Sequence, residues 1–274
     1  MKKTAIFAEG LMFPEAPRWH GDKLWFSDMN AGWVMTIDLS GNLEAVIEVP
    51  GFPSGLGWLP DGRLLVVSMV DRRLLRLDPP VLTEVANLFD TASYHLNDMV
   101  VDSRGRAYIG NFGFDLARQE SFAPAEIILV EPGGGARAAA ENMAFPNGSV
   151  ITPGGETLIV GESLGRRLTA FTIAEDGSLE DRRLWADVSP ATPDGICLDV
   201  EGGIWVASPE TGEVIRVKEG GTITDRLVPS ARPFACMLGG PDRQTLFVCT
   251  SKDAAYRGGR IESVEADVPG AGLP

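Results

Sequence analysis

Apolar positions along the chain occur in short runs, and Gly, Pro and Asp separate these runs. No long segment repeats apolar residues at the i, i+3, i+4 and i+7 spacing of an amphipathic helix. Short apolar runs that end in turn residues are typical of β-strands. The pattern therefore predicts an all-β protein.

One kind of run recurs along the whole chain. The six copies are KLWFSD (23–28), RLLVVS (63–68), RAYIGN (106–111), TLIVGE (157–162), GIWVAS (203–208) and TLFVCT (245–250). Successive copies begin 40, 43, 51, 46 and 42 residues apart. Each copy follows a turn and an earlier apolar strand, and a third strand comes after most copies. A period of about 40–50 residues with several strands per unit is the sequence signature of a β-propeller.

The number of copies predicts a six-bladed β-propeller. It is expected to occupy residues 1–274 as a single domain, because no linker or shift in composition divides the chain. Two strand-like segments at the chain ends, residues 4–7 and 260–264, are expected to complete the same last blade and so close the ring. Closure leaves few free sheet edges. The alternative is a β-sandwich whose regular spacing is accidental.

The first strand of each repeat begins with a distinctive position. Its occupants are Glu15, Ser54, Asn97, Asn147, Asp194 and Phe234, and Pro precedes it in five of the six repeats. The innermost strand of every blade lines the central channel of a propeller, so equivalent positions should form one ring at the channel mouth. Four of these residues carry a carboxylate or amide oxygen, which hard divalent cations prefer. The pattern therefore predicts a metal site at the central channel.

Pro-Asn-Gly and Pro-Asp-Gly are also ordinary turn sequences, so the phase of each tripeptide matters. Residues 60–62 (Pro-Asp-Gly) fall between strands of the second repeat, where a hairpin turn belongs. Residues 193–195 have the same sequence but start a strand, in phase with Glu15 and Asn147. Two carboxylates that face each other across a narrow channel repel unless a proton or a cation lies between them. The phase favours a ligand role for Asp194.

Composition and charge narrow the possible partners. The chain has 24 Lys and Arg against 38 Asp and Glu, a net charge of −14, which argues against nucleic acid and against an anionic membrane surface. No apolar run approaches the roughly 20 residues of a membrane span, and Glu9 and Gly10 interrupt the segment that resembles a signal peptide. The three cysteines lack disulfide or zinc spacing and are expected to be buried thiols in a cytoplasmic protein. The oligomeric state stays open.

These residues resemble the SMP-30/gluconolactonase/LRE-like family of six-bladed propellers, which hold one divalent metal. The segments that carry the resemblance are PEAPRW (14–19), LNDMVVD (96–102), FPNGS (145–149), PDGICLD (193–199) and GRIESVEADVPGAGLP (259–274). The resemblance implies that Glu15, Asn147 and Asp194 are the metal ligands. It also implies that Asn97 helps to hold the substrate or a water molecule on the metal.

Two departures from the family concern the substrate. His95 stands where the sugar-lactone members of the family have an arginine, and Asp115 lies near the place of the family's acidic substrate contact. Losing an arginine removes a multidentate donor for sugar hydroxyls. The residues expected at the rim of the site are mostly apolar: Met12, Phe13, Phe112, Phe114, Met143, Phe145 and Phe234. They favour a small, less polar lactone or ester, with Asn97, Asp115, Phe112 and Phe114 as substrate contacts.

The resemblance and the ring together predict a metal-dependent hydrolase that opens a lactone with an activated water, a gluconolactonase-like carboxylic ester hydrolase. The cation would be calcium, magnesium, manganese, zinc or iron. Asp194 is the first candidate for the base that takes the water proton, and His95 is the second. A lyase, isomerase or phosphotriesterase that uses the same site remains an alternative. So does a non-catalytic, ligand-binding propeller with a structural cation.

A serine nucleophile is not expected, although residues 161–165 match the G-x-S-x-G elbow. That elbow joins a strand to a helix, whereas residues 167–173 alternate like a strand. The motif also requires a histidine later in the chain, but His20 and His95 both precede Ser163.

Overall fold

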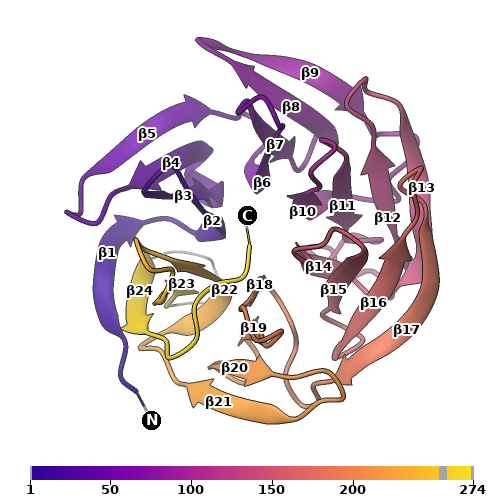
Figure 1. The fold of residues 1–274 in the computed structure, drawn as a ribbon. Coiled ribbons are helices and arrows are strands. Elements are labelled where there is room, and N and C mark those ends of the chain that lie inside the picture. Colours follow the sequence, from indigo (N-terminus) through magenta and orange to yellow (C-terminus); the bar gives the residue numbers. More distant parts are fainter. Residues whose placement is uncertain (1, 253–257, 273–274) are drawn as a thin grey trace.

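Six four-stranded antiparallel sheets surround a central channel in the computed structural model, which describes residues 2–252 and 258–272 (Figure 1). Each sheet is one blade, with its first strand at the channel and its last strand at the outer edge. A single 3-10 turn, η1 (Met29–Ala31), is the only helical segment in these ranges. No helix of the described residues is long and apolar enough to cross a membrane. The predicted six-bladed, all-β propeller is confirmed.

The strands follow the chain blade by blade. Blades 1 and 2 comprise β2 (Pro14–His20), β3 (Lys23–Asp28), β4 (Trp33–Ile37), β5 (Leu43–Glu48), β6 (Pro53–Trp58), β7 (Leu64–Ser68), β8 (Arg73–Asp78) and β9 (Val81–Asn87). Blades 3 and 4 comprise β10 (Leu96–Val101), β11 (Ala107–Asn111), β12 (Ala125–Val130), β13 (Ala136–Met143), β14 (Pro146–Ile151), β15 (Thr157–Glu162), β16 (Arg167–Ile173) and β17 (Leu179–Asp187). Blades 5 and 6 comprise β18 (Ile196–Leu198), β19 (Ile204–Ser208), β20 (Glu213–Val217), β21 (Ile223–Leu227), β22 (Arg232–Gly239), β23 (Thr245–Ser251), β24 (Gly259–Glu265) and β1 (Ala5–Leu11).

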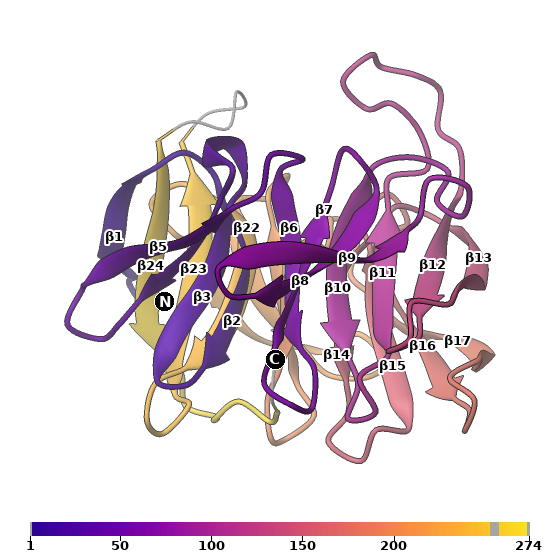
Figure 2. The ribbon, with the colours of Figure 1, turned by 90° about the horizontal axis from the view of Figure 1, so that it is seen from above.

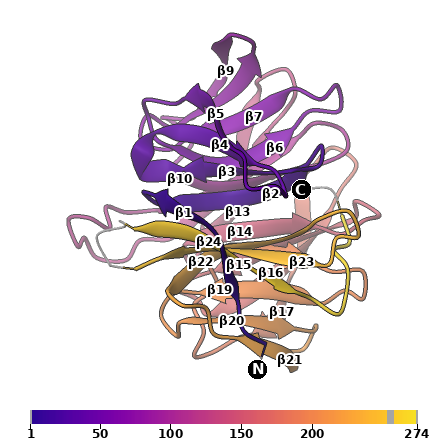
Figure 3. The same cartoon turned by 90° about the vertical axis from the view of Figure 1, so that its left-hand side faces the viewer.

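The two ends of the chain close the ring. Strand β1 is the outer strand of blade 6 and pairs antiparallel with β24, with Ala5 opposite Ser263 and Leu11 opposite Gly259 (Figure 3). The prediction that both terminal segments share the last blade is confirmed. Since the N-terminal strand joins strands from the other end of the chain, the hydrogen bonds of one sheet hold the first and last blades together.

The six recurring apolar runs form the second strands of the blades. These strands are buried along nearly their whole length, as in β7, β11 and β19. A second strand lies between two neighbouring strands of its own sheet and under the faces of the adjacent blades, so both of its faces need apolar side chains. This explains why the runs are continuous rather than alternating, and why they are the clearest repeat in the sequence.

Glycines let the inner strands approach one another closely. A Cβ on Gly148 would lie 2.5 Å from the backbone nitrogen of Ile196, and one on Gly195 would lie 2.4 Å from the Cβ of Ala235. This close approach allows the Gly148 N–H to donate to the Asp194 carbonyl oxygen at 3.1 Å, across the boundary between blades 4 and 5. The backbone around Asp194 is therefore held by its neighbours on both sides.

The two faces of the disc differ (Figure 2). The long loop between β11 and β12 projects from one face, where each first strand begins, and the C-terminal segment lies at the other. That segment crosses beneath blade 5, where Val200 N–H donates to the Pro269 carbonyl and Ala271 N–H donates to the Leu198 carbonyl, at 2.9 and 3.0 Å. We call the face where the first strands begin the entrance face.

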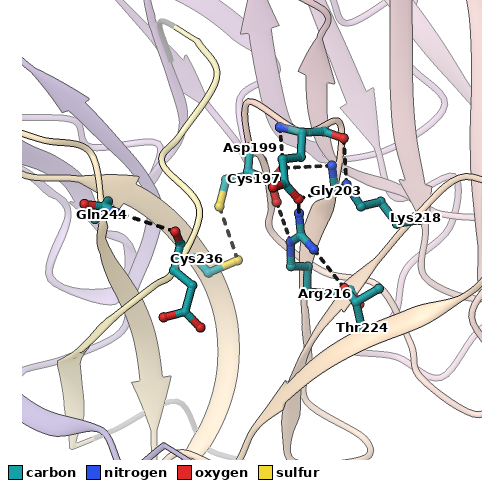
Figure 4. A network of polar contacts seen from close by, with 10 residues as sticks. Cys197, Asp199, Gly203, Arg216, Lys218, Thr224, Cys236 and Gln244 are labelled. Atoms are coloured by element: carbon teal, nitrogen blue, oxygen red, sulfur yellow. Dashed lines mark hydrogen bonds and ion pairs between the residues drawn. The ribbon is translucent and has the colours of Figure 1, made fainter.

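A buried ion pair stabilises blade 5 on the side away from the entrance (Figure 4). Nε of Arg216 donates to Asp199 at 2.6 Å, and the Gly203 N–H donates to the same carboxylate at 2.9 Å. Beside it, the thiols of Cys197 and Cys236 lie 3.9 Å apart without a disulfide. These two cysteines and Cys249 are buried, as the sequence predicted.

Candidate functional site

The four oxygen-bearing residues of the predicted ring lie where inner strands begin on the entrance face. Glu15, Asn97 and Asn147 are each the second residue of their strand, in β2, β10 and β14. Asp194 lies two residues before β18, on the segment that leads into blade 5. Asn97 and Asn147 are 7% and 8% exposed, whereas Glu15 and Asp194 keep partial access to solvent. Part of Glu15 and part of Asp194 are therefore exposed, although burial dominates the environment of their carboxyl groups.

The local backbone explains how these side chains come to face the channel. The pairing of β2 with β3 shifts register between Glu15 and Arg18, and the inner strands of blades 3 and 4 shift at the equivalent point. Such a bulge re-aims a side chain that regular alternation would point elsewhere. In blade 1 the residue after the ring position, Ala16, has a φ of 46°, and its N–H donates to Oε2 of Glu15 at 2.9 Å.

Glu15 and Asp194 are close enough to influence each other's ionisation. Burial, and then the charge of Asp194, hold the pKa of Glu15 well above its usual range. Burial raises the pKa of Asp194 to about 8, although the Asn147 side chain forms a hydrogen bond with its carboxylate. Raised pKa values mean that ionised carboxylates are poorly stabilised here. A proton or a cation must balance their charge.

A buried ion pair adds a third carboxylate to this group. Nη2 of Arg18 donates to Oδ1 of Asp98 at 2.7 Å, with the two side chains 7% and 9% exposed. The pair links β2 of blade 1 to β10 of blade 3. Burial raises the pKa of Asp98, and its charge contributes to the raised pKa values of Glu15 and Asp194. When all are ionised, these three carboxylates and one guanidinium sum to −2, which one divalent cation would neutralise.

The amide groups of the ring use their N–H donors on the protein. Nδ2 of Asn147 donates to Oγ of Ser163 at 3.3 Å, and Ser163 in turn donates to the Pro193 carbonyl at 2.6 Å. Nδ2 of Asn97 donates to the Pro146 carbonyl at 3.3 Å. The amide oxygens are thereby left as the groups that can bind a ligand.

The donor set fits a hard divalent cation by type and by charge. Within residues 2–252 and 258–272, no three His, Cys, Asp or Glu side chains are arranged to hold a metal. A cation at the ring would therefore need the amide oxygen of Asn147 in addition to Glu15 and Asp194.

His95 belongs to a different group of side chains. It stacks on Tyr94 with ring centres 4.2 Å apart. Burial lowers the pKa of His95, and the charge of Arg72 lowers it further. Its titratable neighbours are thus Arg72 and Asp115 rather than Glu15 or Asp194. His95 is in its neutral form near pH 7, but the structure does not bring it together with the other predicted base, Asp194.

Asp115 lies in the loop between β11 and β12 and is 9% exposed. A hydrogen bond with the Tyr94 hydroxyl, and then one from the Arg118 N–H, hold its pKa below the usual value. The Arg118 N–H donates to Oδ1 of Asp115 at 3.0 Å, and Nε of Arg118 lies 3.5 Å from Oδ2. These contacts anchor the loop to the segment that carries His95.

The aromatic residues expected at the rim form two groups. Phe112 and Phe145 stack with ring centres 4.7 Å apart, and Phe114 meets Phe145 at 6.3 Å. Phe13 and Phe234 meet edge to face at 4.8 Å. The first group joins blades 3 and 4, and the second joins blades 1 and 6. Phe13 and Phe145 stand two positions before a ring residue, Phe234 is a ring position itself, and Phe112 and Phe114 follow the second strand of blade 3.

Three features differ from the sequence-based expectations or escaped them. Met143, expected at the rim, is fully buried and packs in the hydrophobic core instead. The sequence could have indicated Asp98, because the position after the ring residue is Ala or Gly in the five other repeats and Asp only here. No pattern in the sequence indicated Arg18, the residue that pairs with Asp98. Ser163 begins a turn that leads into strand β16 rather than a helix, so the serine elbow is absent, and its hydroxyl orients Asn147.

Comparison with known proteins agrees with this architecture. The model of the SMP-30/Gluconolactonase/LRE-like region matches residues 13–252. Pentonolactonase XacC of Haloferax volcanii is 27% identical over 283 residues, which covers 99% of this chain and 93% of the relative. The 6-deoxy-6-sulfogluconolactonase of Pseudomonas putida is 24% identical over 246 residues, covering 87% and 83%.

Solved structures share the fold. The crystal structure of regucalcin from Agrobacterium tumefaciens, described as a calcium-binding protein, superimposes with a TM-score of 0.83 at 21% identity and covers 100% of this chain and 96% of that one. The family model spans far more than half of the sequence, from the start of blade 1 to the end of β23. The chain therefore belongs to the SMP-30/gluconolactonase/LRE-like family.

Proposed function

We propose that the protein is a divalent-metal-dependent lactonase that opens a cyclic ester by attack of water at the channel mouth. The observation that carries the proposal is the pair of carboxyl groups, Glu15 and Asp194, whose pKa values are raised by burial and by nearby negative charge. Relatives named as a pentonolactonase and a sulfogluconolactonase support the reaction class. A relative of the same fold described as calcium-binding supports a cation.

The proposed roles follow from the chemistry of each group. Oxygens of Glu15, Asn147 and Asp194 would hold the cation, which when bound polarises an ester carbonyl and stabilises negative charge on its oxygen. Asp194 takes the proton of the attacking water and returns it to the alkoxide that leaves when the ring C–O bond breaks. Asn97 donates or accepts a hydrogen bond at the substrate. His95 is the second candidate for the base.

The test is proton release from lactones. The protein is treated with a chelator, and acid formation from a sugar lactone, an unsubstituted six-membered lactone and an aryl-fused lactone is followed at constant pH. Calcium, magnesium, manganese, zinc and iron(II) are then added back one at a time. We expect turnover of at least one lactone to disappear with the chelator and to return with a cation.

Two variants make the test specific. Asp194→Asn is expected to lower kcat by about 100-fold or more, the usual contribution of a general base. Asp22→Asn, on an exposed turn outside the site, makes the same change of charge and should leave kcat unaltered. Turnover that survives complete removal of metal would refute metal dependence. A cation that binds and stabilises the fold while no lactone is hydrolysed would instead identify a non-catalytic propeller with a structural cation.

A further inference from the structure

The entrance face carries a second ring of residues outside the ring of ligand candidates. Two positions before each ring residue, four successive blades carry an aromatic side chain: Phe13, Phe52, His95 and Phe145. Their carbonyl oxygens accept hydrogen bonds of 2.9 to 3.1 Å from the residues that follow the second strands, namely Met29, Met69, Phe112 and Ser163. Because the same backbone bond recurs in each blade, these residues lie at one level of the propeller.

The two aromatic groups of the rim lie on opposite sides of the channel. Phe13 and Phe234 join blades 1 and 6, whereas Phe112 and Phe145 join blades 3 and 4. In a ring of six blades these two boundaries are diametrically opposed, as Figure 1 shows for β2 and β22 against β10 and β14. The two groups therefore flank the ring of ligand candidates from opposite sides.

Loops of the entrance face also expose single apolar side chains. Large apolar side chains that are at least 38% exposed occur in loops of the entrance face: Met12, Phe52, Val70, Phe89, Phe122 and Leu164. Exposed apolar side chains around the opening are available to contact an apolar ligand.

The side chains of Asp115 and Ser163, near the rim, already have protein partners. The Asp115 carboxylate accepts the Arg118 N–H and forms a hydrogen bond with Tyr94. The Ser163 hydroxyl donates to the Pro193 carbonyl, and accepts from Asn147. A polyhydroxylated lactone would have to place hydroxyl groups against phenyl rings, where they lose hydrogen bonds to water without replacement.

We infer that the rim selects lactones that are fused to, or carry, an aromatic ring over polyhydroxylated sugar lactones. The inference rests on the proposed lactonase function and assigns its substrate class, which differs from the sugar lactones named for the relatives. Phe13, Phe145 and Phe234 are only 6–9% exposed, so an aromatic substrate ring would contact Phe112 above all, with stacked or edge-to-face geometry. Phe112 is the specificity-determining residue to test, because it is only half-buried and stacks on Phe145.

The experiment compares three lactones of equal ring size with the metal-loaded protein. Dihydrocoumarin carries a fused aromatic ring, δ-valerolactone carries no substituent, and glucono-1,5-lactone carries hydroxyl groups. We expect kcat/KM for dihydrocoumarin to exceed that for δ-valerolactone by at least 10-fold and that for gluconolactone by more. In Phe112→Ala the advantage of dihydrocoumarin should fall by at least 5-fold, while δ-valerolactone changes by less than 2-fold. Leu184→Ala, an exposed apolar residue on the outer strand β17, is the control and should change neither.

Binding of the products separates this inference from the lactonase proposal. Titration calorimetry measures the Kd of 3-(2-hydroxyphenyl)propanoate and of gluconate, two carboxylates that differ in their apolar surface. We expect the aryl product to bind at least 10-fold more tightly and Phe112→Ala to remove this preference. If no lactone turns over but the preference and its loss are seen, the lactonase proposal fails and the inference on the rim stands. Two results would overturn the inference on the rim while leaving the lactonase proposal intact. One is an equal kcat/KM for gluconolactone and dihydrocoumarin, and the other is an equal Kd for the two products.

Discussion

Replacing Asp194 by asparagine should make the metal-free protein more stable near pH 8. Burial raises the pKa of this carboxyl to about 8 from its usual 3.8. A raised folded-state pKa means that the protonated carboxyl stabilises the fold fully below about pH 4, and that this stabilisation is lost as the pH rises towards 8. Asparagine stays neutral throughout, so the variant avoids the loss. The amide also keeps an oxygen that can accept a hydrogen bond from Asn147.

The size of the effect follows from the same pKa. The difference between 3.8 and about 8 corresponds to at most about 6 kcal/mol of unfolding free energy. Partial solvent access to Asp194 and ionisation shared with Glu15 reduce this figure. We therefore expect Asp194→Asn to exceed the wild type by about 2–3 kcal/mol at pH 8 and by about 1.5 kcal/mol at pH 5, because the loss begins near pH 4.

Urea unfolding in the presence of a chelator, at pH 5 and pH 8, measures both values. Asp22→Asn is the matched control, because Asp22 is exposed and has a φ of 61°, a conformation that asparagine tolerates. Added calcium should then stabilise the wild type at pH 8 and stabilise Asp194→Asn much less. If the wild type and Asp194→Asn lose stability in parallel between pH 5 and pH 8, the electrostatic interpretation of the ring is wrong.

Three further substitutions test the surroundings of the ring. Arg18→Met leaves the Asp98 carboxylate buried without its partner and should lower the free energy of unfolding at pH 8 by about 3 kcal/mol. The double variant Arg18→Met/Asp98→Asn should recover part of that loss. If the two substitutions changed the free energy of unfolding additively, the pairing of Arg18 with Asp98 would be contradicted. Ser163→Ala removes the acceptor for Asn147 and should weaken cation binding about 10-fold by calorimetry, whereas an unchanged Kd would show that Ser163 does not orient the amide. Gly148→Ala forces a Cβ against the backbone of blade 5 and should lower the melting temperature by several degrees, unless the blades can separate freely.

The proposed substrate class depends on residues that the sequence named without showing how they group. Phe13, Phe112, Phe145 and Phe234 were all expected at the rim, and their aromatic contacts form two pairs at opposed blade boundaries. His95, by contrast, was expected as a second base beside Asp194. Its partners in the fold are Tyr94, Arg72 and Asp115.

The sequence alone was sufficient for the blade count, the closure of the ring and the positions of Glu15, Asn97, Asn147 and Asp194. These features are local and periodic: each blade repeats the same order of turn, buried strand and turn, so residues in phase occupy equivalent places around an axis. The joining of the chain ends followed from the same count.

Only the tertiary structure decided which in-phase residues interact and what environment they share. The ion pair of Arg18 with Asp98 joins residues that are 80 positions apart, in blades 1 and 3. No periodic pattern in the sequence predicts this pair. The raised pKa values of Glu15 and Asp194 depend on burial and on charges from several blades. Met143 ends the outer strand β13 and packs in the core, a position that its place in the sequence did not indicate. The pKa of a group and the packing of a side chain depend on all the residues around it in space. The repeat in the sequence indicates only which residues occupy equivalent positions in the six blades.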